Sequence, residues 1–249
     1  VHGTFTARDN LAPRFSRRHT IEHPDFDHGR ICLPPAAYAQ EQHKIERRWP
    51  AAVKFIRERG LNETFDGDIG DVGIITQGGL YNAVVRALQL VGLADAFGHS
   101  RLPIYVLNVT YPLIPEEVTA FCAGKRSVLM VEEGQPAYLE DALHAILRRN
   151  ELTTRVHGKD FLPPAGEYTG EVLLEGVAKW LAAAAPPGLD CEAVLSACES
   201  LTAPKRRAAT LLGASVPPRP AGFCIGCPER PVFAAMKLVE REAGGIHVS

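Results

Sequence analysis

The chain has 249 residues, of which 46% are hydrophobic and 22% charged, and its formal net charge is -2. This composition allows an ordinary soluble core, but the near balance of charges argues against a general nucleic-acid surface, because phosphate binding needs a basic footprint. No apolar run approaches the roughly 18 residues of a membrane-spanning helix, so we expect no membrane association.

The cysteine content indicates the cellular location of the protein, and the first residues bear on whether the chain is part of a longer protein. Six cysteines in 249 residues are too few for a disulfide scaffold, so we expect a cytoplasmic location. The sequence starts at Val1 with neither an initiator methionine nor a signal-peptide pattern. We therefore expect the chain to be an excised piece of a longer protein.

The first 65 residues predict a connector with two helical stretches. Residues 1–35 are polar and interrupted by prolines, and they hold four of the nine histidines. His19 and His23 lie four apart, but a proline follows at once and no acidic partner is suitably placed, so a solvated connector is favoured over a metal site. Residues 36–59 have a helical composition, in which Pro50 separates two helices or starts the second, and Gly60 ends it.

The middle of the chain predicts an α/β domain at about residues 66–165. Short apolar runs alternate with amphipathic stretches, which is the pattern of buried parallel strands joined by right-handed helical crossovers. Strands are expected at 72–75, 104–109, 127–131 and within 153–159, and helices at 82–93, 115–122 and 137–149. The fold class is therefore α/β, a three-layer α/β/α arrangement with a mostly parallel sheet, flanked by helical and extended segments.

The last third of the chain predicts helices and an extended linker. A helix is expected at 169–185, ended by Pro186 and Pro187, and residues 188–215 have a weaker helical pattern. A proline-rich linker follows, then the loop "GFCIGC", and then a helix within 231–244 that a glycine pair ends.

Gly78 and Gly79 stand between an expected strand and an expected helix. Anions do bind at helix N-termini, but the surrounding "TQGGLYNA" matches neither a dinucleotide fingerprint nor a P-loop. A tight structural turn is the favoured interpretation, with a positive φ expected at one of the two glycines. Both glycines stay candidates for a ligand or interface site.

Polar residues at the ends of two strands are further candidates. Tyr111 follows the second strand, and Glu132 and Glu133 follow the third. Ligands of open α/β sheets bind outside the carboxyl ends of the strands, and two adjacent carboxylates could serve acid–base chemistry. Successive side chains point in different directions, however, so capping of the next helix or a subunit interface is the favoured alternative.

Cys224 and Cys227 have the C-x-x-C spacing, but their surroundings fit no common site. A thioredoxin-like pair follows a strand, whereas a proline linker precedes this one. Structural zinc and iron–sulfur clusters need four ligands, and no second C-x-x-C exists, so we expect no metal here. We expect these cysteines to be free thiols in an exposed loop, and Phe223, Val232, Phe233 and Met236 to be loosely held or docked on the α/β core.

Four stretches carry a family resemblance. The block 72–143 contains Tyr111-Pro112-Leu113-Ile114-Pro115 and Val131-Glu132-Glu133, and "LPPAAYAQEQHKIERRW" and "FLPPAGEYTGEVLLEGVAKWL" flank it. "RPAGFCIGCPERPVFAAMK" is similar to an Arg-Pro-Pro-x-x-Cys-Pro-Gly-Cys-Pro-His-Arg motif, from which it departs at Ile225 and Glu229. Together they resemble the large (alpha) subunit of indolepyruvate:ferredoxin oxidoreductase, in the 2-oxoacid:ferredoxin oxidoreductase superfamily, and its transketolase C-terminal-like domain in particular.

The resemblance implies how the chain is divided. Residues 1–65 would be a connector that follows a missing pyrimidine-binding domain, 66–165 the transketolase C-terminal-like domain, 166–218 a helical segment and linker, and 219–249 the truncated start of the thiamine-diphosphate-binding domain. Cys224, Gly226 and Cys227 would then lie near the cofactor. The family's Mg²⁺-binding Gly-Asp-Gly…Asn motif does not occur after them. The fragment is therefore expected to be structural and interdomain, without catalytic residues or a cofactor of its own, and to be inactive alone.

The resemblance also implies the reaction and the partners of the full enzyme. They are the oxidative decarboxylation of an arylpyruvate to an acyl-CoA, with thiamine diphosphate, Mg²⁺ and [4Fe-4S] clusters as cofactors. Expected partners are the other domains, a smaller oxidoreductase subunit or domain, a ferredoxin-type acceptor, coenzyme A and further copies in a homo-oligomer. The alternative is a free-standing α/β module that binds a nucleotide or an acidic ligand at the Gly78-Gly79 turn.

Overall fold

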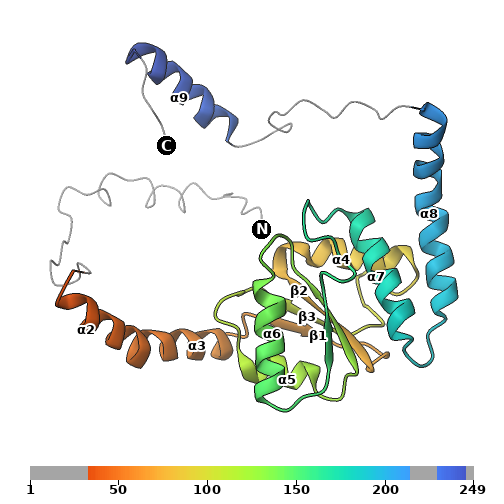
Figure 1. The fold of residues 1–249 in the computed structure, drawn as a ribbon, viewed down its shortest axis with the longest axis horizontal. Coiled ribbons are helices and arrows are strands. Elements are labelled where there is room, and N and C mark those ends of the chain that lie inside the picture. The colour runs from red at the N-terminus through yellow and green to blue at the C-terminus, as the bar shows by residue number, and fades with distance from the viewer. Residues whose placement is uncertain (1–32, 214–228, 245–249) are drawn as a thin grey trace. The chain divides into compact units, whose positions relative to one another are not determined.

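The computed structural model describes residues 33–213 and 229–244 (Figure 1). By its internal contacts the chain divides into two compact units, Val1–Ala203 and Pro204–Ser249, and each is described by itself. Within the described ranges, none of the helices combines the length and the apolar character needed to cross a bilayer.

A mostly parallel sheet forms the centre of the first unit. The described residues contain five strands in the order β1-β3-β2-β4-β5. The pairs β2–β3, β2–β4 and β4–β5 are parallel, and only β1 runs antiparallel, along the edge of β3. Their bounds are β1 Glu63–Phe65, β2 Val72–Gln77, β3 Ile104–Leu107, β4 Ser127–Val131 and β5 Arg155–His157. The expected α/β class with a mostly parallel sheet is confirmed.

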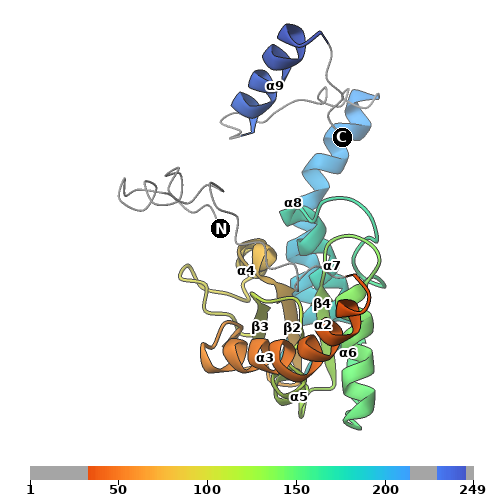
Figure 2. The same cartoon turned by 90° about the vertical axis from the view of Figure 1, so that its left-hand side faces the viewer.

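Helices cover both faces of this sheet, as Figures 1 and 2 show. Helix α4 (Tyr81–Leu90) packs against α7 (Gly170–Ala184) on one face, and α5 (Pro115–Cys122) packs against α6 (Tyr138–Arg149) on the other. The chain leaves β2 through α4 to reach β3 on one side, and then crosses through α5 to β4 on the other side. The direction of winding therefore reverses between β2 and β4, which is the topological switch point of the sheet.

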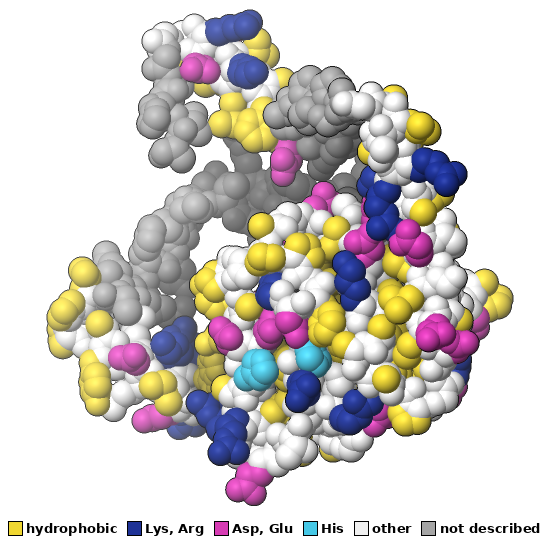
Figure 3. Space-filling model, turned by 45° about the vertical axis from the view of Figure 1, so that its right-hand side comes forward, with side chains coloured by type: hydrophobic (Ala, Val, Ile, Leu, Met, Phe, Trp, Pro, Cys, Tyr) yellow, Lys and Arg dark blue, Asp and Glu magenta, His cyan; other side chains and the backbone are white. Residues whose placement is uncertain are grey.

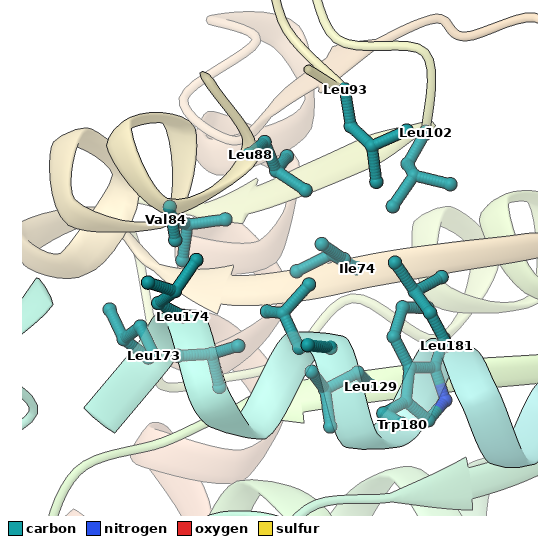
Figure 4. Close-up of a cluster of buried hydrophobic side chains, with 14 of the residues drawn as sticks. Ile74, Val84, Leu88, Leu93, Leu102, Leu129, Leu173, Leu174, Trp180 and Leu181 are labelled. Atoms are coloured by element: carbon teal, nitrogen blue, oxygen red, sulfur yellow. The ribbon is translucent and has the colours of Figure 1, made fainter. Parts of the chain in front are cut away.

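The apolar runs of the strands reflect this three-layer arrangement. In β2, Ile74 faces the cluster under α4 and α7, and its neighbour Ile75 faces the cluster under α5 and α6. Successive strand residues point to opposite faces, so a strand covered on both sides needs a continuous apolar run. Figure 4 shows side chains of α7, including Leu174 and Leu181, pointing toward Ile74 and Leu129 of the sheet.

The N-terminal helices match the expectation for residues 36–59. Helix α2 (Ala36–His43) continues through a π-helical stretch, η3 (Lys44–Arg48), into α3 (Trp49–Glu58). Pro50 lies in the first turn of α3, where its missing N–H costs least, and the π-helical stretch lies directly before it. Gly60 follows with a φ of +54° and ends the helix. Of the residues in α2, η3 and α3, only Ile56 is buried.

Strand β1 has no signal in the sequence. Its three residues, Glu63 to Phe65, are all exposed, so no apolar run marks them. They are held by backbone pairing with β3 and by Asn108, whose side-chain amide donates to Leu61 O at 2.9 Å and to the Glu63 carboxylate at 2.8 Å. This strand therefore depends on tertiary contacts that the local sequence does not indicate.

The C-terminal helices lie close to where the sequence predicts them. Helix α8 (Cys191–Leu212) contains Pro204, where the second unit begins, and its first half packs Val194 and Cys198 into the core under α7. In the second unit α9 (Arg230–Glu242) has no buried residue, and Val232 and Phe233 are 57% and 42% exposed. The loop with Cys224 and Cys227, and Phe223 with it, lies outside the described residues.

Candidate functional site

The carboxyl ends of β2, β3 and β4 meet at one edge of the sheet, beside a pocket of about 410 Å³. Gln77 ends β2, and Glu132 directly follows β4, so the pocket lies at the topological switch point where open α/β sheets bind ligands. The chain after β3 and the start of α6 complete its walls. The lining residues are Gln77, Thr110, Tyr111, Leu113, Glu132, Tyr138, Leu139 and Ala142.

Glu132 caps the helix that follows it. The residue is 5% exposed, and its carboxylate accepts hydrogen bonds from the backbone N–H groups of Leu139 at 3.0 Å and Glu140 at 3.1 Å. These groups belong to the first turn of α6, whose own N-cap residue, Ala137, offers no side-chain acceptor. The free N–H groups and the positive end of the helix dipole stabilise a buried carboxylate. Helix capping, the alternative left open by the sequence, therefore describes Glu132.

Glu133 ties two loops together. Its N–H donates to the side-chain oxygen of Gln77 at 3.0 Å, and its carboxylate accepts the N–H of Tyr168 at 2.6 Å. The adjacent carboxylates of Glu132 and Glu133 thus bind different backbone segments. Such an arrangement orders the carboxyl edge of the sheet, and it does not aim two acids at one substrate atom.

Lys159 and Tyr168 complete the same edge. The Lys159 ammonium donates to the backbone oxygen of Glu132 and to the Tyr168 hydroxyl, the latter at 2.8 Å. The Tyr168 hydroxyl donates in turn to Pro163 O at 2.8 Å. Burial lowers the pKa of Lys159 against the opposing effect of the nearby glutamates, and burial together with those glutamates raises the pKa of Tyr168 to about 12. Sequence reasoning missed both residues, because they become neighbours of Glu132 only in the folded chain.

The glycine pair forms a turn of a different kind from the one expected. Gly78 to Leu80 are a 3-10 turn, η4, and neither Gly78 nor Gly79 has a positive φ, so that expectation was wrong. A tight 3-10 turn leads from strand to helix without a left-handed residue. Gly78 is required for another reason: a Cβ on it would lie 2.5 Å from Asn108 Oδ1, whereas one on Gly79 would meet nothing within 4 Å.

Two exposed tyrosines flank the pocket. Tyr111 and Tyr138 are 76% and 72% exposed, and the ring of Tyr111 makes an edge contact with Trp49 at 5.3 Å between centroids. The pocket thus joins exposed aromatic rings to the apolar side chains of Leu113, Leu139 and Ala142. Tyrosine and tryptophan are common at the centres of protein interfaces, so this surface suits contact with another protein segment or an apolar ligand.

The lining of the pocket does not suit a phosphate. It contains no lysine or arginine, and its one carboxylate, Glu132, is already hydrogen-bonded. On the face drawn in Figure 3, acidic and basic side chains are interspersed, which agrees with the near-zero net charge. Within residues 33–213 and 229–244, no group of three or more His, Cys, Asp or Glu side chains could hold a metal ion.

The structure brings some of the predicted site residues together, and others lie outside the described part of the chain. Gly78, Tyr111, Glu132 and Glu133 come from turns at one edge of the sheet, and Tyr111 and Glu132 line one pocket. The predicted cofactor-binding residues Cys224, Gly226 and Cys227 lie outside the described part of the chain. Gln77 and Tyr138 were missed, since the expected strand stopped at residue 75 whereas β2 continues to Gln77.

Comparison with known proteins identifies relatives of the chain, which its fold alone does not. No family model matches it. It is 30% identical over 215 residues to the indolepyruvate oxidoreductase subunit IorA of Methanothermobacter thermautotrophicus, covering 85% of this chain and 30% of that subunit. It is also 30% identical over 238 residues to the subunit IorA of Archaeoglobus fulgidus, covering 92% of this chain and 32% of that subunit.

A solved structure is also similar in part. The 2-oxoglutarate:ferredoxin oxidoreductase from Magnetococcus marinus, with 2-oxoglutarate, coenzyme A and succinyl-CoA bound, matches 58% of this chain and 23% of its own. The sequence identity is 19% and the TM-score is 0.41.

The fold and the hydrogen bonds at the carboxyl edge of the sheet define the class of domain. It is a three-layer α/β domain in which Glu132 and Glu133 order that edge. The sequence relatives point the same way as the resemblance. Over most of its length the chain is similar to indolepyruvate oxidoreductase IorA subunits, and it spans about a third of the length of the relatives it matches.

Proposed function

We propose that this chain is the central segment of a thiamine-diphosphate-dependent arylpyruvate:ferredoxin oxidoreductase, and that the segment is a scaffold between the parts that carry the cofactors. One observation supports this above all. The identity of 30% extends over 85–92% of the chain, yet covers only 30–32% of subunits named for indolepyruvate oxidation. This partial coverage supports a role for the chain as one part of a larger subunit.

In this proposal each part of the chain has a place in the larger enzyme. Residues 1–65 connect a pyrimidine-binding domain to the α/β domain of residues 66–165. Residues 166–218 lead onward to residues 219–249, which begin the thiamine-diphosphate-binding domain, with Cys224, Gly226 and Cys227 near the cofactor. The position of Pro204 at the boundary between the two compact units is compatible with a new domain beginning in the last part of the chain.

The pocket at the switch point does not fit thiamine diphosphate. A diphosphate held through Mg²⁺ needs oxygen ligands and positive charge, and the pocket at the switch point offers one carboxylate, already bonded, and no basic side chain. We therefore assign thiamine diphosphate, Mg²⁺ and the [4Fe-4S] clusters to parts of the enzyme beyond these residues. Bound there, thiamine diphosphate would supply the carbanion chemistry of decarboxylation.

The hydrogen bonds at the carboxyl edge of the sheet support the scaffold role. Glu132, Glu133 and Lys159 order three loops and the start of α6. The exposed rings of Trp49, Tyr111 and Tyr138 would then be covered by another domain, the smaller subunit or a second copy of the chain. Coenzyme A and a ferredoxin-type acceptor would be bound by the assembled enzyme.

The alternative, a free-standing module for a nucleotide or an acidic ligand, has less support. Its phosphate would have to lie at the Gly78-Gly79 turn, beside a pocket whose only charged lining residue is Glu132. Phosphate sites at helix N-termini commonly add a basic side chain, and none lines this pocket.

An activity assay of the purified chain tests this proposal. With thiamine diphosphate, Mg²⁺, coenzyme A and a dye acceptor, we expect no decarboxylation of indolepyruvate or phenylpyruvate. The Archaeoglobus fulgidus enzyme, assayed in parallel, is the positive control. Turnover by the isolated chain would contradict the scaffold role, and a thermal shift with nucleotides but not with thiamine diphosphate would favour the alternative.

A further inference from the structure

A second hollow, of about 270 Å³, lies at the amino-terminal ends of β4 and β5, away from the pocket described above. Most of the residues that line it have polar side chains, and two of them are arginines. Arg126 and Ser127 come from the start of β4, and Thr153, Arg155 and His157 come from β5 and the loop before it. The two hollows therefore differ in chemistry as well as in position.

The hollow results from how α7 covers the sheet. Register places Ser127 beside Arg155, and Val156 between Arg155 and His157 faces the opposite core cluster. Because side chains alternate along a strand, Arg155 and His157 point to the α7 side. There α7 presents only the small side chains of Ala183 and Ala184, which leave space above the edge strand.

One of the two arginines is already fixed. Arg126 forms an ion pair with Asp71 at 2.8 Å and donates to the backbone oxygen of Ala184. These partners use part of its hydrogen-bonding capacity and balance its charge. Arg126 thus forms a wall of the hollow whose charge is balanced by Asp71.

Arg155 is different. Its side chain is exposed, and within the described residues no carboxylate forms an ion pair with it. Arg155 therefore contributes an uncompensated positive charge to the hollow. A planar guanidinium in this state suits a two-point contact with a phosphate or a carboxylate.

Two further groups can donate into the same space. Ser127 is 3% exposed, and its oxygen accepts the indole N–H of Trp180 at 3.0 Å, so its own proton is available to an acceptor in the hollow. His157 binds Asp160 through Nδ1 at 2.5 Å, which leaves Nε2 as its second polar atom. Thr153 adds a hydroxyl at the rim.

We infer that this hollow binds the oxyanion group of a small molecule, a phosphate or a carboxylate, with Arg155 as its principal ligand and Ser127 as a buried donor. The volume suits a compact anionic group and is below the usual range for whole cofactors, about 300–1,000 Å³. The inference goes beyond the proposed scaffold role and does not depend on it.

Titrations followed by two-dimensional NMR on the isotope-labelled full chain test this site. The probes are inorganic phosphate, pyrophosphate and malonate, each compared with sodium chloride at equal ionic strength. We expect saturable shifts at Ser127, Thr153 and His157 with at least one probe. Binding of phosphate or pyrophosphate but not malonate would indicate a phosphate site. Binding of malonate alone would indicate a carboxylate site.

Two matched variants make the result specific. Arg155→Gln, at an exposed strand position, should weaken binding by about tenfold or more, the usual effect of losing a charged hydrogen bond. Arg86→Gln, an exposed arginine on α4, should leave binding unchanged. Absence of saturable shifts with all three probes, shifts outside the hollow, or equal affinity in Arg155→Gln would each overturn the inference.

Discussion

Glu132 is a buried carboxylate whose stabilising role depends on a helix seven residues further along the chain. It accepts two backbone N–H groups in the first turn of α6. Glutamine at this position would keep the shape of the side chain but present an amide NH₂ group to one of those donors. Even with the amide oxygen in the place of Oε2, which accepts from both N–H groups, the NH₂ group would face the N–H of Leu139, and the negative charge at the helix N-terminus would be lost.

We therefore expect Glu132→Gln to lower the free energy of unfolding by about 1–3 kcal/mol. Urea denaturation followed by circular dichroism measures it. Glu58→Gln is the control, because Glu58 is exposed in a surface pair with Lys54 and should change stability by less than about 1 kcal/mol. Equal midpoints for the two variants would show that the cap does not stabilise α6.

The two glycines at the end of β2 give a second test at the residue scale. A Cβ on Gly78 would collide with Asn108 Oδ1, and Asn108 cannot turn away without losing its bonds to Leu61 and Glu63. Gly79 has open space and an ordinary φ. We expect Gly78→Ala to cost about 1–3 kcal/mol.

Gly79→Ala should be neutral or should stabilise the protein by up to about 1 kcal/mol, because alanine has less freedom in the unfolded chain. Thermal or urea unfolding of both variants measures the two changes in stability. If Gly79→Ala were the more harmful substitution, the turn would differ from the one described.

Helix α7 shows how packing can outweigh helix propensity. Gly176 lies within this helix, where alanine would be favoured by about 1 kcal/mol on propensity alone. A Cβ there would lie 2.4 Å from Leu162 Cδ2 and 3.2 Å from Phe161 O, so the loop before α7 would have to move. Close contact between helix and loop therefore explains the glycine.

We expect Gly176→Ala to destabilise the protein by about 1–3 kcal/mol, the usual cost of overpacking. Gly170→Ala, in the first turn of the same helix with nothing within 4 Å of the added methyl group, is the matched control and should not destabilise it. Differential scanning calorimetry compares the two. A gain in stability for Gly176→Ala would mean that propensity dominates in α7.

Elements with a strong local signal were predictable, and those that depend on tertiary contacts were not. The runs in β2 and β4 are apolar because both faces of the sheet are covered, so they stand out in the sequence. β1 is exposed throughout and exists through its pairing with β3. The cap on α6 comes from Glu132, outside the window in which a local capping residue is sought.

At the scale of the whole molecule, the site was only partly predictable. The rule that ligands bind at the carboxyl ends of strands pointed to Tyr111 and Glu132, and both line the pocket there. Tyr138 and the Lys159–Tyr168 pair come from other elements, and only the fold brings them together. The proposed function came from the order of several weak motifs along the chain, and IorA subunits are similar to the chain over most of its length.

As proposed above, this chain would be the scaffold segment of an indolepyruvate-oxidising enzyme. The most direct test replaces the matching segment of the Archaeoglobus fulgidus subunit IorA with this chain, which aligns with it over 238 residues. The measurement is indolepyruvate-dependent reduction of an electron acceptor by the purified chimera, after its assembly and cofactor content have been matched to the parent. We predict activity within about tenfold of the parent, a loss of no more than about 1.4 kcal/mol in transition-state stabilisation. A chimera that assembles and carries its cofactors but does not oxidise indolepyruvate would contradict the claim.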